Sequence, residues 1–201
     1  MVYLTISTGI GGGLILGGRL IHGVGDAAGE VGHMIVEPGG MPCGCGSRGC
    51  LETICSGTNI ARRAKERLAD GRRSSLLLGV GGGVEAITAR AVAEAARAGD
   101  AVAAEVWDET IEYLALGVGN VIAAFAPEAV ILGGGVSTAG DQLLVPLRRR
   151  IRESVKIAPV EKVRIEQAAL GGDSGVYGAL ILGRQAYAAR PLHGDAKTSR
   201  A

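Results

Sequence analysis

Aromatic residues, long apolar runs and an excess of charge are all lacking in this 201-residue sequence. Aromatic side chains make up 3% of it, which argues against a stacking surface for single-stranded nucleic acid. The net charge of +1 argues against a surface that binds polyanions or membranes. No apolar run is long enough to span a bilayer, and no segment resembles a signal peptide. We therefore expect a cytoplasmic protein that binds neither nucleic acid nor membrane.

Glycine and cysteine are present but unevenly distributed. The 34 glycines occur in clusters, as expected for tight turns or for backbone pressed against a ligand. All four cysteines lie between positions 43 and 55. In a reducing compartment, such a group indicates metal ligation before it indicates a disulfide.

The hydrophobic pattern predicts an α/β layered domain. An antiparallel meander comes first, with strands expected at residues 2–7, 14–16 and 19–22, and a long loop follows over residues 23–55. Helices and strands then alternate. We expect helices over residues 58–68, 85–97, 101–125, 143–155 and 175–188, and strands over residues 129–132 and 163–168.

Three residues are expected to cap helices, namely Ser56, Asp100 and Asp173. Between the first two helices, residues 71–83 are expected to form a variable connection. The helix over residues 143–155 carries four arginines that we expect to be solvated: Arg148, Arg149, Arg150 and Arg152.

The strongest chemical signal comes from His33, Cys43, Cys45 and Cys50. Three thiolates and one imidazole complete a tetrahedral zinc shell, and the intervening glycines let the backbone fold back on itself. Since four protein ligands leave no open position, the zinc is expected to be structural. The second ring nitrogen of the histidine then stays available for a ligand. Cys55 is left over and is expected to be a small buried residue.

Two carboxylates are anchored next to this cluster. Glu30 precedes His33 by three residues, and Glu52 follows the last cysteine ligand by two. Carboxylates held by a rigid metal loop are suited to accept hydrogen bonds from the vicinal hydroxyls of a sugar. Asp26 and Glu37 lack this anchoring, and we expect them to be solvated acids.

Two glycine-rich segments are candidates for phosphate binding. The first joins two strands and has neither the Lys-Ser/Thr of a P-loop nor a complete dinucleotide fingerprint, so a nest of backbone N–H groups beside a hydroxyl remains. The second follows the strand at residues 129–132, where α/β proteins bind nucleotides. A plain tight turn is the alternative for each. The candidate residues are Thr8, Gly9, Ile10, Gly11, Gly12, Gly133, Gly134 and Gly135.

The motifs TGIGGG, GEVGH and CGCGSRGCLE resemble those of the ROK family of sugar kinases and sugar-responsive repressors, and within it the bacterial glucokinases. The resemblance implies an actin/hexokinase-like ATPase (ribonuclease H-like) fold of two lobes with sugar and ATP between them. Residues 1–187 would form the C-terminal lobe, and residues 188–201 a disordered tail.

The resemblance also implies roles for the residues. It assigns structural Zn²⁺ to the histidine and the three cysteines, and ATP with Mg²⁺ to the two glycine-rich segments. Ser7 stands where the family usually has glycine. The resemblance implies contacts to sugar hydroxyls from Glu30, His33 and Glu52.

The sequence contains neither the Asp-x-Gly-Gly-Thr loop nor the Asn-Asp-Ala-Asn stretch of family kinases. The aspartate of that stretch takes the proton from the attacking hydroxyl. No aspartate here, including Asp26, Asp141 and Asp173, has a matching context. The resemblance therefore places the base in an N-terminal lobe that this sequence lacks, and we expect the chain to be inactive alone.

The leading hypothesis is part of an ATP-dependent sugar kinase that phosphorylates the 6-hydroxyl of a hexose, with glucose favoured. One alternative is the sugar-sensing module of a ROK transcriptional repressor, and another is a lone zinc-stabilised binding or assembly lobe. The resemblance also implies a homo-oligomer. Related sugars differ by single hydroxyls or an amide, so the sequence leaves the sugar open.

Overall fold

The computed structural model describes residues 1–79 and 83–188. They fall into two compact units, Met1–Ala169 and the segment that begins at Leu170. The predicted tail at residues 188–201 lies outside the described residues, apart from Ala188. Within the described ranges, no helix is long and apolar enough to cross a membrane.

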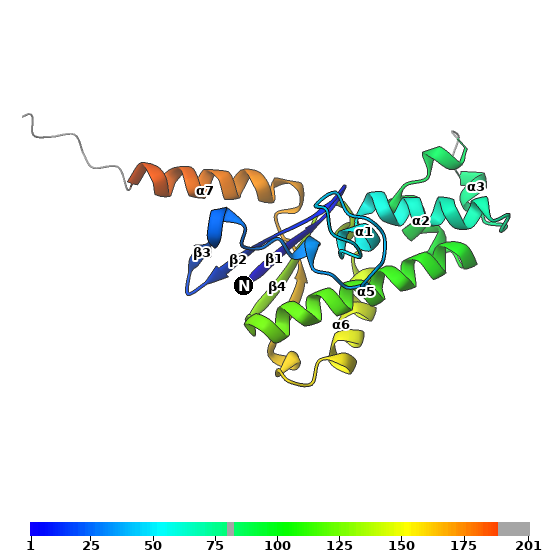
Figure 1. The fold of residues 1–201 in the computed structure, drawn as a ribbon. Helices are drawn as coiled ribbons and strands as arrows, with labels where there is room; N and C mark the ends of the chain where they lie inside the picture. The colour runs from blue at the N-terminus through cyan, green and yellow to red at the C-terminus, as the bar shows by residue number, and fades with distance from the viewer. Residues whose placement is uncertain (80–82, 189–201) are drawn as a thin grey trace, which may run out of the picture. The chain divides into compact units, whose positions relative to one another are not determined.

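The first unit is built on a five-stranded mixed sheet in the order β3-β2-β1-β4-β5 (Figure 1). Its first three strands pair antiparallel, which confirms the predicted meander. The next two pairs, β1 with β4 and β4 with β5, are parallel. The strands are β1 (Val2–Ile6), β2 (Ile10–Leu16), β3 (Arg19–Ile21), β4 (Ala129–Gly133) and β5 (Arg164–Gln167).

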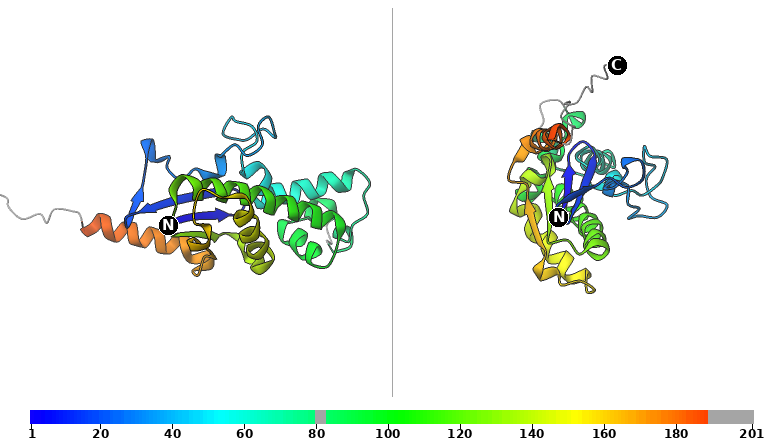
Figure 2. Two further views of the ribbon diagram at one scale, coloured as in Figure 1. Left: turned by 90° about the horizontal axis from the view of Figure 1, so that it is seen from below. Right: turned by 90° about the vertical axis from the view of Figure 1, so that its left-hand side faces the viewer.

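The helices of the first unit pack around α5, the longest of them, which contacts α1, α2, α4 and α6 (Figure 2). Short 3₁₀ turns named η1–η5 join several elements, and η6 with α7 belongs to the second unit. The α-helices are α1 (Glu52–Cys55), α2 (Gly57–Ala69), α3 (Leu76–Gly79), α4 (Ala89–Arg97), α5 (Ala101–Phe125), α6 (Asp141–Ser154) and α7 (Ser174–Ala188). The 3₁₀ turns are η1 (Val24–Asp26), η2 (Val31–His33), η3 (Val84–Ala86), η4 (Gly135–Ala139), η5 (Val160–Lys162) and η6 (Gly171–Asp173).

The core lies between this sheet and the helices. Alternate residues of β1 are fully buried, as the period of a strand requires. Helix α5 contributes a buried face that includes Leu114 and Ile122. The sheet contributes Leu4, Ile6 and Leu132, which are also fully buried. Apolar burial of this kind is the dominant stabilising term for the unit.

Two of the predicted caps are confirmed. The Asn59 backbone N–H donates to the Ser56 hydroxyl at the start of α2, and the Ala103 N–H donates to the Asp100 carboxylate at the start of α5. The prediction that a helix begins at residue 85 is wrong, because Thr88 caps α4 and residues 84–86 form η3 instead. Asp173, the third predicted cap, directly precedes α7. Helix α3 lies in the predicted variable connection, whose residues 80–82 are outside the described part.

Strand β2 begins earlier than its sequence predicts. Gly11, Gly12 and Gly13 lie in the strand, paired with residues 3–5 of β1, and do not form a loop. A Cβ atom on Gly12 would lie 2.7 Å from the Gly29 carbonyl oxygen. Close approach of two backbones therefore overrides the low strand propensity of glycine here.

The four arginines of α6 are not all solvated. Arg150 forms ion pairs with Asp108 and Glu112 of α5. Arg148 is half-buried and donates to the Ile165 carbonyl of β5. The prediction of solvation is wrong for these two because their positions on the helix face neighbouring elements. It holds for the exposed Arg149 and Arg152.

Candidate functional site

The four predicted metal ligands come together in a loop that projects from the sheet (blue to cyan in Figure 2). Donor atoms of His33, Cys43, Cys45 and Cys50 all lie within 4.8 Å of one another. The Cys43 Sγ lies 3.5 Å from the His33 Nδ1, and the Cys45 Sγ lies 3.7 Å from the Cys50 Sγ. A tetrahedral zinc shell with ordinary bond lengths sets these separations at about 3.6 and about 3.8 Å. The cluster therefore has the donors and the size for zinc.

Tight turns give the loop this shape. The Cys43 backbone N–H donates to the Ser47 carbonyl, and the Gly46 N–H donates back to the Cys43 carbonyl. At Gly49 the backbone has a φ of +72°, and an added Cβ would collide with the Glu37 carbonyl oxygen. Only glycine relieves both constraints, so Gly49 is a geometric requirement of the loop.

The thiols differ in their readiness to ligate a metal. A hydrogen bond from the Ser47 backbone N–H lowers the pKa of Cys45 to about 7. Burial raises the pKa of Cys50 to about 12. A metal that binds here must therefore displace the Cys50 proton at neutral pH. Cys55 stands apart: it is fully buried, burial raises its pKa, and its thiol donates to the Thr110 carbonyl. Its predicted role as a small buried residue is confirmed.

The ring of His33 points its two nitrogens at different partners. Nδ1 faces the cysteine sulfurs, so Nε2 is directed away from them, toward Glu30. The Nε2 atom lies 3.8 Å from the Glu30 Oε2, which is too long for a direct hydrogen bond. A hydroxyl group bound beside this pair could accept from the imidazole and donate to the carboxylate.

Glu52 links the metal loop to the turn between β1 and β2. Its Oε2 accepts a hydrogen bond of 2.7 Å from the Ile10 backbone N–H. A Cβ on Gly9 would lie 2.5 Å from the same oxygen, so glycine is needed for this approach. The predicted phosphate nest thus gives one of its donors to a carboxylate of the protein.

The same turn is fastened to the start of α2. The Gly57 backbone N–H donates to the Ser7 carbonyl over 2.6 Å, and the Thr58 hydroxyl donates to the Thr8 carbonyl over 2.9 Å. These bonds leave the Thr8 side chain free to face a large cleft, whose lining includes it.

This cleft, about 790 Å³ in volume, lies where β1 and β4 end. Parallel pairing sets Thr5 opposite Gly133, so the two glycine-rich segments emerge at the same edge of the sheet. Thr8 and Gly135 line the cleft. The other predicted phosphate-segment residues are outside its lining: Gly9, Ile10, Gly11, Gly12, Gly133 and Gly134.

Two of those glycines meet the sheet itself. At Gly134, whose φ is +82°, an added Cβ would collide with the Ile6 carbonyl oxygen. At Gly133 an added Cβ would collide with the Tyr3 ring. Packing against β1 therefore explains why both positions are glycine, whether or not a ligand is present.

The opposite wall of the cleft was not anticipated from the sequence. It consists mainly of α4, with Arg90, Glu94 and Arg97 among the lining residues, and of Trp107 from α5. Arg90 pairs with Glu94 at 2.9 Å, and the Arg97 Nε donates to Gln142. The sequence shows an amphipathic helix here, but a polar helix face that lines a cleft has the same pattern as one that faces bulk water.

Of the two acids expected to be solvated, one differs from its prediction. Glu37 is half-buried and accepts a hydrogen bond of 3.2 Å from the Tyr113 hydroxyl of α5. Burial, reinforced by the Glu37 charge, raises the pKa of Tyr113. Asp26 is exposed and pairs with His22, as expected for a solvated acid.

Comparison with known proteins points to one family. The sequence model of the ROK family matches residues 1–186. A glucokinase of Halalkalibacterium halodurans is 42% identical over 187 residues, which are 92% of this chain and 56% of that protein. The chain thus spans about half the length of this relative.

Solved structures agree in fold. A ROK family glucokinase from Streptomyces griseus, in complex with glucose and AMPPNP, superposes with a TM-score of 0.81 and 39% identity, over 92% of this chain and 60% of that one. A ROK family transcriptional regulator, described as a homologue of the E. coli MLC protein, superposes with a TM-score of 0.72 and 30% identity, over 83% of this chain and 41% of that one. The α/β fold of the sugar kinases in this family is therefore present here.

Proposed function

The chain belongs to the ROK family, and from this premise we propose that it is part of an ATP-dependent sugar kinase that transfers a phosphoryl group to the 6-hydroxyl of a hexose. Support comes from the glucokinase relatives and from the glucose and AMPPNP bound in the Streptomyces griseus structure. We place the reaction in the cytoplasm, where thiols stay reduced and available to a metal.

The cysteine and histidine cluster is proposed to hold a structural Zn²⁺. His33, Cys43, Cys45 and Cys50 would fill all four positions, so the ion supplies order to the loop and no open coordination site. Ligation through Nδ1 would fix the tautomer of His33 and aim its Nε2 at the same space as Glu30.

The sugar is proposed to bind between Glu30, His33 and Glu52. The single observation that carries this proposal is the 3.8 Å separation of the Glu30 Oε2 from the His33 Nε2. This spacing suits a hydroxyl hydrogen-bonded to both, and the metal loop holds both groups in place. Glu52 has one oxygen on Ile10 and its second oxygen available for another hydroxyl. Glucose is the favoured hexose.

ATP, with Mg²⁺, is proposed to occupy the cleft at the ends of β1 and β4. The phosphates would lie at the turn that contains Thr8, and the nucleoside would lie toward Gly135 and α4. The general preference of α/β proteins for ligands at the carboxyl ends of parallel strands supports this orientation. The cleft also has room for a nucleotide.

The general base is proposed to lie outside these 201 residues. Within the cleft lining the acidic side chain is Glu94, which belongs to α4 and pairs with Arg90. Without a base the attacking hydroxyl keeps its proton. The chain by itself is then expected to bind its ligands without turnover.

Calorimetric titration of the purified chain with D-glucose tests the sugar site. Glu30→Gln should weaken binding at least about tenfold, because a charged acceptor is lost. Asp26→Asn is the matched control, since it removes an exposed charge four residues away and should leave the affinity unchanged. Equal affinities for the two variants would contradict the proposal. A coupled assay of the same chain should detect no glucose-dependent ADP release.

The alternative, a sugar-sensing module, draws on the similarity to the ROK transcriptional regulator. It predicts the same sugar contacts but no need for the cleft at the ends of β1 and β4. Titration with AMPPNP separates the two: binding in the cleft favours the kinase, and glucose binding without nucleotide binding favours the sensor.

A further inference from the structure

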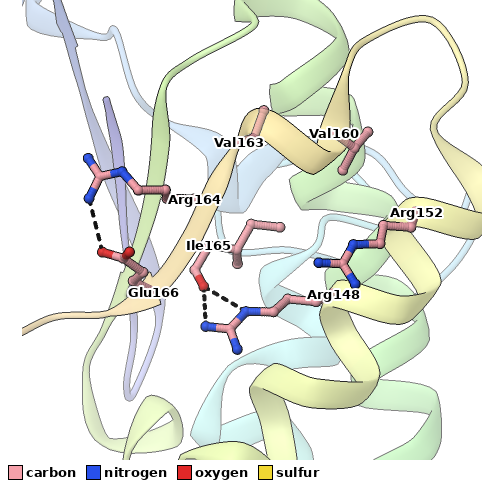
Figure 3. Close-up of a pocket in the computed structure, with 7 residues that line it drawn as sticks. All are labelled: Arg148, Arg152, Val160, Val163, Arg164, Ile165 and Glu166. Carbon is pink, nitrogen blue, oxygen red and sulfur yellow. Dashed lines mark hydrogen bonds and ion pairs between the residues drawn. The ribbon is translucent and has the colours of Figure 1, made fainter.

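A second, smaller pocket lies between α6 and β5, which is an edge strand of the sheet. Its volume is about 240 Å³. It shares no lining residue with the larger cleft, so it is a separate feature of the fold. Figure 3 shows its walls, which combine two arginines of α6 with apolar side chains around β5.

Arg148 is fixed in this pocket by the backbone of the strand. Its Nε and Nη2 both donate to the Ile165 carbonyl, at 2.8 and 2.5 Å. Because β5 is an edge strand, this carbonyl is open to a side-chain donor. These two bonds to one carbonyl oxygen fix the guanidinium group in the pocket. Its Nη1 has no protein partner among the described residues.

Arg152 lies one helical turn further along and points into the same space (Figure 3). Its guanidinium forms no hydrogen bond or ion pair with any residue in the described ranges. Like charges at this spacing on a helix repel each other. Two guanidinium groups thus line one pocket, and neither is paired with a carboxylate of the described residues.

Glu166 also lines the pocket, but its carboxylate is paired with a third arginine. Glu166 pairs with Arg164 at 3.3 Å, and Figure 3 shows that pair on the other side of β5 from Arg148. Over residues 148–166 the sequence has seven basic and three acidic residues, in a chain whose net charge is +1. The segment that forms this pocket is thus rich in positive charge.

The rest of the lining combines the charged Arg164 and Glu166 with three apolar residues. Val160 and Ile165 are buried and Val163 is partly buried, and all three line the pocket. Apolar side chains beside the two guanidinium groups lower the local dielectric constant and so strengthen the attraction of these groups for an anion. Planar guanidinium donors match the oxygens of a phosphate group better than those of a halide.

We propose that this pocket binds the phosphate group of a small anion, either inorganic phosphate or a phosphomonoester with a short carbon body. The Nη1 of Arg148 and the guanidinium of Arg152 donate to the phosphate oxygens, and the valine side chains contact whatever carbon is attached. The bound anion joins α6 to β5 and so stabilises this edge of the sheet.

Backbone amide NMR shifts of the full chain test the site, with inorganic phosphate as the probe and sodium chloride as the reference at equal ionic strength. Shifts are expected at Val163, Ile165 and Glu166, with saturation in the millimolar range. Arg152→Ala should weaken the affinity about fivefold or more, as for the loss of a charge-assisted hydrogen bond. This variant removes no bond within the protein, so it should fold normally.

Arg149→Ala is the matched control, because it removes the same charge from an exposed position of α6 outside the pocket lining. It should leave the affinity within about twofold. Equal losses in both variants would mean general charge attraction and would overturn the proposal, as would shifts confined to Thr8 and its turn. A parallel titration with glycerol 3-phosphate distinguishes the sources: tighter binding than phosphate assigns the pocket to phosphomonoesters, and equal binding assigns it to inorganic phosphate.

Discussion

The loop that carries the proposed metal ligands and the sheet-and-helix body of the first unit differ in their regular structure and in their burial. Within residues 30–52, all of them described, regular structure amounts to η2, two isolated bridges and the first residue of α1. The body instead buries large apolar side chains completely, among them Leu114, Leu132 and Leu147. In our proposal the loop depends on a bound metal for order, whereas the body depends on burial of apolar area.

The proposed site is divided between these two regions. The loop supplies Glu30 and His33, which face a sugar in our proposal, whereas the body supplies both walls of the cleft proposed for the nucleotide. Glu52 is one point of contact between the two, since it begins α1 and accepts from Ile10. Each region should therefore be open to disruption without loss of the other.

The largest effect is expected from loss of a metal ligand. Cys45→Ser should abolish zinc binding at stoichiometric concentrations, because structural zinc sites contribute about 10–16 kcal/mol that depends on all their ligands. Zinc content by atomic absorption and far-UV circular dichroism check this. The metal should be lost while the helix content stays close to that of the unchanged chain.

Cys55→Ala serves as the control for that experiment. It removes a cysteine that is buried in the core and bonded to the Thr110 carbonyl, away from the cluster. Zinc content should remain one per chain. A loss of metal in this variant, or retention in Cys45→Ser, would show that the ligand set is different.

The next effect concerns the body. Leu114→Ala should lower the free energy of unfolding by about 2–5 kcal/mol, since it empties a fully buried position of α5. Denaturant titration followed by circular dichroism measures it. Leu116→Ala, two residues along the same helix and 44% exposed, should cost less than about 1 kcal/mol. Similar losses for the two would contradict the buried face assigned to α5.

A smaller effect is expected where the two regions meet. Glu52→Ala should cost about 1.5–3 kcal/mol, because the Ile10 N–H loses a charged acceptor. The proposed sugar and nucleotide affinities should both fall, in contrast to Glu30→Gln, which should affect the sugar alone. Calorimetric titrations with glucose and with AMPPNP measure this. An unchanged AMPPNP affinity in Glu52→Ala would show that nucleotide binding at the turn between β1 and β2 does not depend on Glu52.

The smallest effect is a pH dependence of the body. Burial alone would raise the pKa of Asp100, but the N–H groups of Ala103 and Ser75 and the hydroxyls of Ser74 and Ser75 hold it below its usual value. A depressed pKa contributes stability above the unfolded value of about 3.9, and that stability is lost as the pH falls through the folded pKa. Asp100→Asn should therefore cost about 1 kcal/mol at pH 7 and less at pH 3.

Denaturant titrations at both pH values measure this change. On acidification, metal binding by the loop should be lost at a higher pH than the stabilising effect of the Asp100 cap. Cysteine thiolates are protonated at a higher pH than a carboxylate is. A cost of Asp100→Asn that grows on acidification would contradict a depressed pKa for this carboxyl.

Much of this architecture follows from the sequence, and the exceptions share a cause. The bounds of α5 and the caps Ser56 and Asp100 are readable because periodicity and capping are local. The cluster of His33 and three cysteines is readable because such side chains, closely spaced, have few other roles. The Tyr113 contact to Glu37 and the α4 wall of the cleft were missed, because each depends on contacts between segments far apart in the sequence. The glycines of β2 were missed because glycine has a low strand propensity, which the pairing with β1 overrides.

The central claim is that a metal-ordered loop creates the sugar-binding group of side chains. Glucose titration of one preparation, before and after removal of zinc by a chelator and again after zinc is restored, tests it most directly. Our account predicts that binding disappears with the metal and returns with it, while the circular dichroism of the body stays the same. Glucose affinity that is unchanged in the zinc-free chain would contradict the claim.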